Sequence, residues 1–229
     1  MDLDRRAELE ANLAEVRQRI ESAADAAGRN PADVQLIAVT KTRPLSDIRI
    51  LRDLGVMDFG ENRDQEAQPK AEEWARVDGR EVRWHFVGQL QTNKAKSVAG
   101  YAHLVHTVDR PSLADALPKP GRALDCLVQL SIDGDVERGG CARHDIQALA
   151  DRLTDPLALR GIMAVAPLSM DPHAAFAIVR EVHEELLSRF PAATVRCIGM
   201  SDDLEAAVRA GATHVRIGTA LLGKRHPAQ

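Results

Sequence analysis

Three short segments of the sequence hold residues that could bind a phosphorylated carbonyl compound. Lys41 ends the apolar run LIAVT, GMSDD places Ser201 after another apolar run, and RIGTALLG places Gly218 and Thr219 after a third. A lysine amine can attack a carbonyl carbon to form a Schiff base. Hydroxyl groups and a glycine that lets a ligand approach the backbone suit a phosphate. The segments therefore predict a Schiff-base site beside a phosphate site.

Eight short apolar runs, separated by charged, alanine-rich stretches, would have to position these residues. The alternation predicts β-strands joined by helices, and hence parallel strands with right-handed crossovers. We expect an amphipathic N-terminal helix at about residues 2–28, followed by the repeating units at about residues 34–225. The expected strands span residues 34–40, 57–61, 83–88, 103–108, 123–132, 159–165, 194–200 and 214–219.

Eight such units favour an α/β fold of the closed (β/α)8 TIM-barrel type over an open doubly wound sheet. No proline- or serine-rich linker interrupts residues 1–229, so we expect a single domain. In these barrels the C-terminal strand ends build the site. The predicted strands place Lys41, Ser201, Gly218 and Thr219 at such ends, and therefore on one rim.

Each of these residues also has an ordinary structural explanation. Lysine often ends an apolar strand, because its stem packs while its amine stays in water, and Ser201 and Thr219 suit helix N-caps. The last two strands of a barrel are neighbours, however, and the loops after them are the usual phosphate site. Burial of Lys41 beside that site would lower the pKa of its amine and prepare it for attack.

Arg216 indicates the kind of ligand. It lies two residues before Gly218, so the alternation of side chains along a strand points both inward. An arginine that faces a bound heterocycle can donate a hydrogen bond to a ring nitrogen. Because the guanidinium is always charged, it would keep that nitrogen unprotonated, which predicts a weak electron sink.

Composition excludes several classes of protein. Thirty basic against 34 acidic residues give a net charge of −4, which offers no field for nucleic acid. No apolar run reaches the roughly 18 residues of a membrane span, and the N-terminus is too charged for a signal peptide. Cys126, Cys141 and Cys197 lie far apart and lack metal-ligand spacing. We expect a cytoplasmic protein that binds no nucleic acid, membrane or metal.

The segments AVTK, FGEN, WHFVGQLQTNK, LRGIMAVAP, GMSDDLEAA and VRIGTALLG occur in that order along the chain. In this order they resemble the YggS/PROSC family of pyridoxal phosphate homeostasis proteins, over about residues 7–225. The resemblance implies a fold-type III barrel, related to the alanine racemase N-terminal domain, that carries pyridoxal 5′-phosphate (PLP). It also implies site positions: Lys41 for the Schiff base, Arg216 for the pyridine nitrogen, Ser201, Gly218 and Thr219 for the phosphate, and Asn62, His85 and Met200 for the pocket wall.

The chain departs from the family pattern at a few positions. Arg63 and Asp64 follow FGEN where the family usually has an aromatic residue and valine, and Arg138 replaces a frequent lysine. None of these residues falls on a cofactor position. The departures therefore concern surface contacts and partners rather than PLP binding.

Two functions from different classes fit the resemblance. A two-base amino-acid racemase needs a second proton-transfer group opposite the lysine, and in alanine racemases this group is a tyrosine. The one tyrosine here, Tyr101, precedes the fourth strand, at the wrong end of the barrel. A PLP homeostasis protein that holds, buffers or delivers PLP needs no catalytic residue, and we favour it. A Schiff-base aldolase would use the same lysine but leaves Arg216 unexplained.

The expected partners follow from this function. PLP is the expected ligand, amino acids are further candidates, and transient contacts with PLP-dependent enzymes are compatible with delivery. We expect a monomer, because the domain that forms the racemase dimer is absent and no apolar surface stripe stands out in the sequence.

Overall fold

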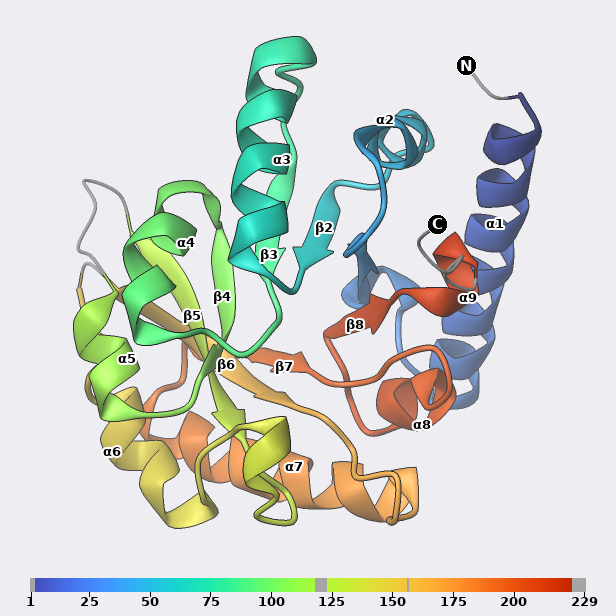
Figure 1. Cartoon of the computed structure of the whole chain (residues 1–229). Helices are drawn as coiled ribbons and strands as arrows, with labels where there is room; N and C mark the ends of the chain where they lie inside the picture. Colours follow the sequence, from blue (N-terminus) through green and yellow to red (C-terminus); the bar gives the residue numbers. More distant parts are fainter. Residues whose placement is uncertain (1–2, 118–122, 156, 224–229) are drawn as a thin grey trace.

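Eight parallel strands form a closed barrel in the computed structural model, which describes residues 3–117, 123–155 and 157–223 (Figure 1). The strands follow one another around the barrel in chain order, and the eighth pairs with the first. This arrangement confirms the predicted (β/α)8 fold. The strands are β1 (Gln35–Val39), β2 (Asp58–Glu61), β3 (Arg83–Phe86), β4 (Leu104–Val108), β5 (Leu124–Leu130), β6 (Leu157–Ala164), β7 (Val195–Cys197) and β8 (His214–Ile217).

The predicted strands are confirmed to within a few residues. β6 begins two residues earlier than expected, at Leu157. β7 is shorter than expected, because the chain turns at Gly199, whose φ is 93°. The helices around the barrel are α1 (Leu3–Ala26), α2 (Leu45–Asp53), α3 (Asp64–Val77), α4 (Ala95–Tyr101), α5 (Pro111–Ala116), α6 (Ile146–Ala150), α7 (Pro172–Arg189), α8 (Leu204–Arg209) and α9 (Thr219–Leu222), with short 3₁₀ helices at Pro31–Asp33, Thr92–Lys94, Val136–Arg138 and Arg143–Asp145.

Helix α1 packs against the last two helices of the chain, α8 and α9 (Figure 1). Its buried face carries Leu9, Leu13, Val16 and Ile20, whose three- and four-residue spacing puts them on one side of a helix. The first helix therefore packs on the helices that follow β7 and β8.

Apolar and polar groups share the interior of the barrel. Ile37, Leu127, Met163 and Cys197 belong to one buried cluster. Since β1 and β5 lie on opposite sides of the closed barrel, a cluster with members from both fills its centre. A larger apolar cluster lies between the strands and the helices.

The N-terminal end of the barrel holds a polar network around Asp58, the first residue of β2. Its carboxylate accepts hydrogen bonds from Arg83 (Nε to Oδ1, 2.6 Å) and Gln35, and lies 2.8 Å from Nε2 of His85. Burial alone would raise the pKa of the Asp58 carboxyl, but the bonds with His85 and Arg83 outweigh it and lower that pKa to about 2. A cavity of about 340 Å³ lies at this end, and Asp58, Arg83 and His85 are among the residues that line it.

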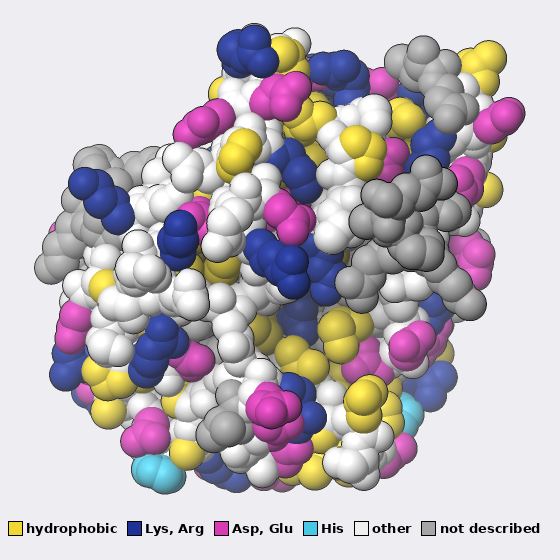
Figure 2. Space-filling model, in the orientation of Figure 1, with side chains coloured by type: hydrophobic (Ala, Val, Ile, Leu, Met, Phe, Trp, Pro, Cys, Tyr) yellow, Lys and Arg dark blue, Asp and Glu magenta, His cyan; other side chains and the backbone are white. Residues whose placement is uncertain are grey.

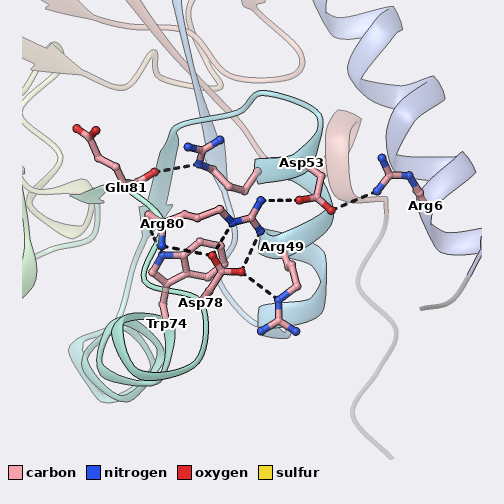
Figure 3. Close-up of polar contacts among 8 residues, drawn as sticks. Arg6, Arg49, Asp53, Trp74, Asp78, Arg80 and Glu81 are labelled. Atoms are coloured by element: carbon pink, nitrogen blue, oxygen red, sulfur yellow. Dashed lines mark hydrogen bonds and ion pairs between the residues drawn. The ribbon is translucent and has the colours of Figure 1, made fainter.

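An ion network on the surface joins α2 to the segment between α3 and β3 (Figure 3). Arg80 donates to Asp53 at 2.7 Å and to Asp78 at 2.6 Å, while Arg49 donates to Asp78 at 3.2 Å. The indole of Trp74 donates to the Arg80 carbonyl at 2.8 Å. The hydrogen bond from Arg80 is the main reason that the pKa of Asp78 is low. Elsewhere, acidic and basic side chains are mixed over the face that Figure 2 shows.

We expect the free energy of unfolding to fall as the pH drops from about 6.5 towards 4, because buried histidines stay neutral in the folded state. Burial is the main cause that lowers the pKa of His214 from 6.5 to about 4. Below pH 6.5 the unfolded state binds a proton that the folded state does not, so stability is lost with falling pH. His214→Gln should remove on the order of 2 kcal/mol of this loss. Urea titrations at pH 7.5 and pH 4.5 measure it.

His144→Gln is the matched control, because the His144 side chain is 84% exposed. An acid-induced loss of stability that is the same in His214→Gln as in the control would contradict this account of His214.

Candidate functional site

Three consecutive strand ends bring Lys41, Ser201 and Thr219 to one sector of the C-terminal mouth. β8 pairs with both β7 and β1, and Ile217 is in register with Ala38. A Cβ placed on Gly218 would lie 3.7 Å from the Cβ of Val39. Lys41 follows Val39 by two residues, so it leaves the barrel next to the turn that starts α9.

Two adjoining turns, which we call the cradle (residues 199–203 and 218–220), carry the predicted phosphate residues. The amide of Ala220 donates to the hydroxyl of Ser201 at 3.2 Å, so the turns after β7 and β8 touch each other. Thr219 is the first residue of α9 and is exposed. The expectation that Ser201 starts a helix is wrong: α8 begins at Leu204, after the cap residue Asp203.

The first cradle turn depends on a glycine. Gly199 has a φ of 93°, and a Cβ there would overlap the Cβ of Ala207 on α8. The turn is closed by Asp203, whose carboxylate accepts a hydrogen bond from the amide of Met200 at 2.6 Å. Met200, predicted as part of the pocket wall, is 38% exposed, which leaves its side chain accessible.

Helix α1 braces the cradle from behind. The guanidinium of Arg19 donates to the carbonyl of Ser201 at 2.8 Å and, through Nε, to the carboxylate of Glu205 at 2.6 Å. The amide of Asn12 donates to the carbonyl of Leu221 at 3.0 Å. No sequence pattern assigns a role to these α1 residues, because the polar face of an amphipathic helix does not reveal which loops it will cover.

Arg216 is buried just below the cradle, as the alternation of side chains along the strand predicts. Its guanidinium donates to the carbonyl of Cys197 at 2.9 Å and to the carbonyl of Ala164 at 3.0 Å. It also lies 3.1 Å from the sulfur of Cys197. Burial raises the pKa of the Cys197 thiol. The thiol therefore stays protonated and unreactive.

Lys41 lies in a two-residue turn between β1 and α2. Its side chain is exposed, so the burial considered from the sequence is not observed. The reason is that β1 ends at Val39, so Lys41 lies beyond the strand, in the turn that follows it. The next residue, Thr42, has a φ of 63°, which is unusual for a β-branched residue.

Asn62 follows β2 and lines two neighbouring cavities of about 740 and 290 Å³. A Cβ on Gly88, two residues after β3, would overlap the Asn62 carbonyl, so the segments that follow β2 and β3 are closely packed. Asn62 therefore lies at the mouth next to Lys41. The cradle lies on the other side of Lys41, because the strand order is β7, β8, β1 and β2.

The structure does not bring His85 to the cradle. Its Nε2 lies 2.8 Å from Asp58, and its Nδ1 lies 2.9 Å from Nε2 of His106. His85 is 4% exposed and its ring takes part in the polar network of the N-terminal half. The motif gives the position of His85 in its strand. It does not determine which neighbours the His85 ring will contact.

A buried cluster next to Lys41 has no counterpart among the predicted site residues. The hydroxyl of Thr40 and the amine of Lys70 each donate to Oε1 of Glu61 at 2.6 Å. Thr40 and Glu61 are 0% and 1% exposed. Burial raises the pKa of Glu61, while Lys70 and Thr40 oppose that shift. Because the contact depends on how α3 packs on β1 and β2, the sequence alone carries no signal for it.

Tyr101 is the last residue of α4, outside the barrel. Its hydroxyl is buried, and burial, followed by the charges of Asp64 and Glu61, raises its pKa. A buried phenol with a raised pKa is not available to take a proton from a ligand at the mouth.

Over the described residues, no helix combines the length and the apolar character that crossing a membrane requires. In the same part of the chain, no group of three or more His, Cys, Asp or Glu side chains is arranged to hold a metal ion.

Known proteins share both the sequence and the fold. The family model of the alanine racemase N-terminal domain matches residues 9–226. The chain is 43% identical to the pyridoxal phosphate homeostasis protein of Pseudomonas aeruginosa, over 93% of this chain and 94% of that protein. It is 40% identical to the protein of the same name from Mycobacterium tuberculosis, over 97% and 95% of the two chains.

A solved structure agrees with these relatives. PipY of Synechococcus elongatus, solved with and without PLP bound, is 33% identical to this chain with a TM-score of 0.81, and the match covers 94% of this chain and 100% of PipY. The ordered motifs, the closed barrel and the near-complete coverage of these relatives agree, and the chain belongs to the family of pyridoxal phosphate homeostasis proteins, built on the barrel of the alanine racemase N-terminal domain.

Proposed function

We propose that this protein binds PLP at the C-terminal mouth of its barrel and serves PLP homeostasis, by holding the cofactor through Lys41 and releasing it to other proteins. The observation that carries the proposal is the order of the strand ends. β7, β8 and β1 are consecutive in the closed barrel, and Ser201, Thr219 and Lys41 follow them. Relatives named pyridoxal phosphate homeostasis proteins, and PipY with PLP bound, support the choice of ligand.

The chemistry of the residues at the mouth fits PLP. Ser201 and Thr219 would donate hydroxyl hydrogen bonds to the phosphate, and Gly218 would let it approach the backbone. PLP supplies an aldehyde carbon, to which a lysine nitrogen can bond as a Schiff base with loss of one water. Exposed Lys41 presents its amine where such an aldehyde can arrive from solvent.

Arg216 would face the pyridine nitrogen. The two carbonyls that accept its hydrogen bonds hold the guanidinium in place below the cradle. Because a guanidinium cannot act as an acid near neutral pH, it would leave the ring nitrogen unprotonated. We assign Asn62 and Met200 to the pocket wall, and we assign His85 to support of the barrel rather than to ligand contact.

A role in holding and releasing PLP fits the site better than racemization of amino acids does. A two-base racemase needs a second proton-transfer group, and the buried hydroxyl of Tyr101 is not available for it. The exposure of Lys41 allows PLP to enter and leave, as buffering or delivery requires. The aldolase alternative leaves the buried guanidinium of Arg216 without a role.

We further propose that the protein is a cytoplasmic monomer that acts as a single domain, with amino acids and PLP-dependent enzymes as transient partners. Cys126, Cys141 and Cys197 are free thiols, which suits a reducing compartment. Arg63 and Asp64, where the chain departs from the family pattern, line the 740 Å³ cavity beside Asn62. A partner that approaches the mouth would therefore meet Arg63, whose side chain is 71% exposed, whereas Asp64 is buried. Light scattering of the PLP-loaded protein tests the monomer.

Lys41→Ala should abolish the covalent attachment of PLP. Wild-type protein loaded with PLP is expected to be yellow, and borohydride reduction should fix the cofactor to a peptide that contains residue 41. The variant should stay colourless after removal of free PLP, with no reduced adduct found by mass spectrometry. Lys96→Ala removes another exposed lysine and serves as the control. An adduct that persists at another lysine in Lys41→Ala would contradict the assignment.

Ser201→Ala and Thr219→Val should each weaken PLP binding about 10- to 100-fold, the cost of one hydrogen bond to a charged group. Pyridoxal, which lacks the phosphate, should bind these variants and the wild type equally well. Spectroscopic titration measures both affinities. Ser188→Ala, on α7, is the control. Equal losses for PLP and pyridoxal would contradict a phosphate role for the cradle.

The PLP-loaded protein is not expected to exchange the α-proton of alanine or serine. In deuterated water, NMR should show no enzyme-dependent loss of that proton signal over hours at micromolar protein. Exchange that requires Lys41 would instead favour the racemase.

A further inference from the structure

The turn that carries Lys41 is held in a strained backbone conformation. Among the described residues, Thr42 is the one non-glycine residue with a positive φ, at 63°. Such a conformation persists where the surroundings dictate it. The bonds on either side of Lys41 must therefore be strong enough to hold the turn.

Helix α3 supplies a contact on each side of Lys41. The amine of Lys70 donates to the carbonyl of Thr40 at 3.0 Å, and the carboxylate of Glu66 accepts from the amide of Thr42 at 3.1 Å. Glu66 and Lys70 are four residues apart and so lie on the same face of α3. The backbone before and after Lys41 is thus fastened to one helix face.

A buried ion pair anchors this contact. The Lys70 side chain is 10% exposed and the Glu61 side chain is 1% exposed, and the two are 2.6 Å apart. The Thr40 hydroxyl donates to the same oxygen of Glu61, while Oε2 of Glu61 is buried without a hydrogen-bond partner among the described residues. Apolar residues of similar volume often serve stability as well as a buried ion pair does. Stability alone therefore does not require this pair.

We propose that Glu61, Lys70 and Glu66 are positioning residues that fix the Lys41 turn, so that the amine of Lys41 is presented to the aldehyde of a ligand whose phosphate occupies the cradle. The inference rests on the proposed role of Lys41. Lys70 does not compete for the aldehyde, because its amine is committed to Glu61 and to the Thr40 carbonyl. The cradle is braced separately, by α1, so the two halves of the site can be tested apart.

The test compares two ligands in Lys70→Met and Glu66→Ala. PLP reports attachment to Lys41, whereas 4-deoxypyridoxine 5′-phosphate has the phosphate and the ring but no aldehyde. We expect attachment of PLP to slow about 10- to 100-fold, the cost of misplacing a reacting group. The affinity for 4-deoxypyridoxine 5′-phosphate should stay within about twofold, because the cradle is untouched.

A readout without cofactor accompanies this comparison. Hydrogen exchange of the peptide that covers residues 40–43 should become faster in both variants, since the turn loses a contact to α3. Arg76→Met, which removes an exposed cation from the same helix, is the matched control. Glu66→Gln retains an oxygen acceptor for the Thr42 amide and should restore attachment to near the wild-type rate.

Each outcome decides the proposal. Unchanged attachment in Glu66→Ala and Lys70→Met overturns it, and so does a parallel loss of both ligands. If Lys70→Met does not fold, Glu66→Ala decides alone, because it leaves the buried pair of Glu61 and Lys70 intact. Wild-type protein that binds 4-deoxypyridoxine 5′-phosphate but attaches no PLP would overturn the proposed role of Lys41 itself, and the positioning role with it.

Discussion

Closure of the barrel by the pairing of β8 with β1 is the constraint on which the site depends. Four register pairs, from Gln35 with His214 to Ala38 with Ile217, join the two strands. This ladder brings together residues that are about 180 positions apart in the chain. Without it, the amine of Lys41 and the hydroxyl of Thr219 would sit at opposite edges of an open sheet. One set of backbone hydrogen bonds therefore brings together the two groups on which the proposed site depends.

The two halves of the site are supported by different helices. The N-terminal helix α1 holds the cradle through Arg19 and Asn12, whereas α3 holds the Lys41 turn through Glu66 and Lys70. The supports lie behind the strand ends, so the mouth itself stays open. That division suits the proposed function, in which the phosphate is bound at the cradle and the ligand can still exchange, since neither support covers the entrance.

The fold was predictable because its signal is local and repeated. Eight apolar runs with helical stretches between them define the units, and the right-handed crossover rule leaves few ways to connect them. The positions of Lys41, Ser201 and Thr219 at strand ends follow from the same pattern. The exposure of Lys41 and the inward turn of His85 were not predictable, because they depend on where each strand stops and on which neighbour each ring meets.

The sequence by itself determined the order of the strands, the residues at their C-terminal ends and the family to which the chain belongs, because each of these depends on residue types at fixed spacing. Only the tertiary structure decided that Glu61 meets Lys70 beneath the Lys41 turn, that Arg19 reaches Ser201, and that His85 bonds Asp58. These contacts join elements whose relative placement results from the packing of the whole barrel, and no short-range pattern of residues encodes that placement.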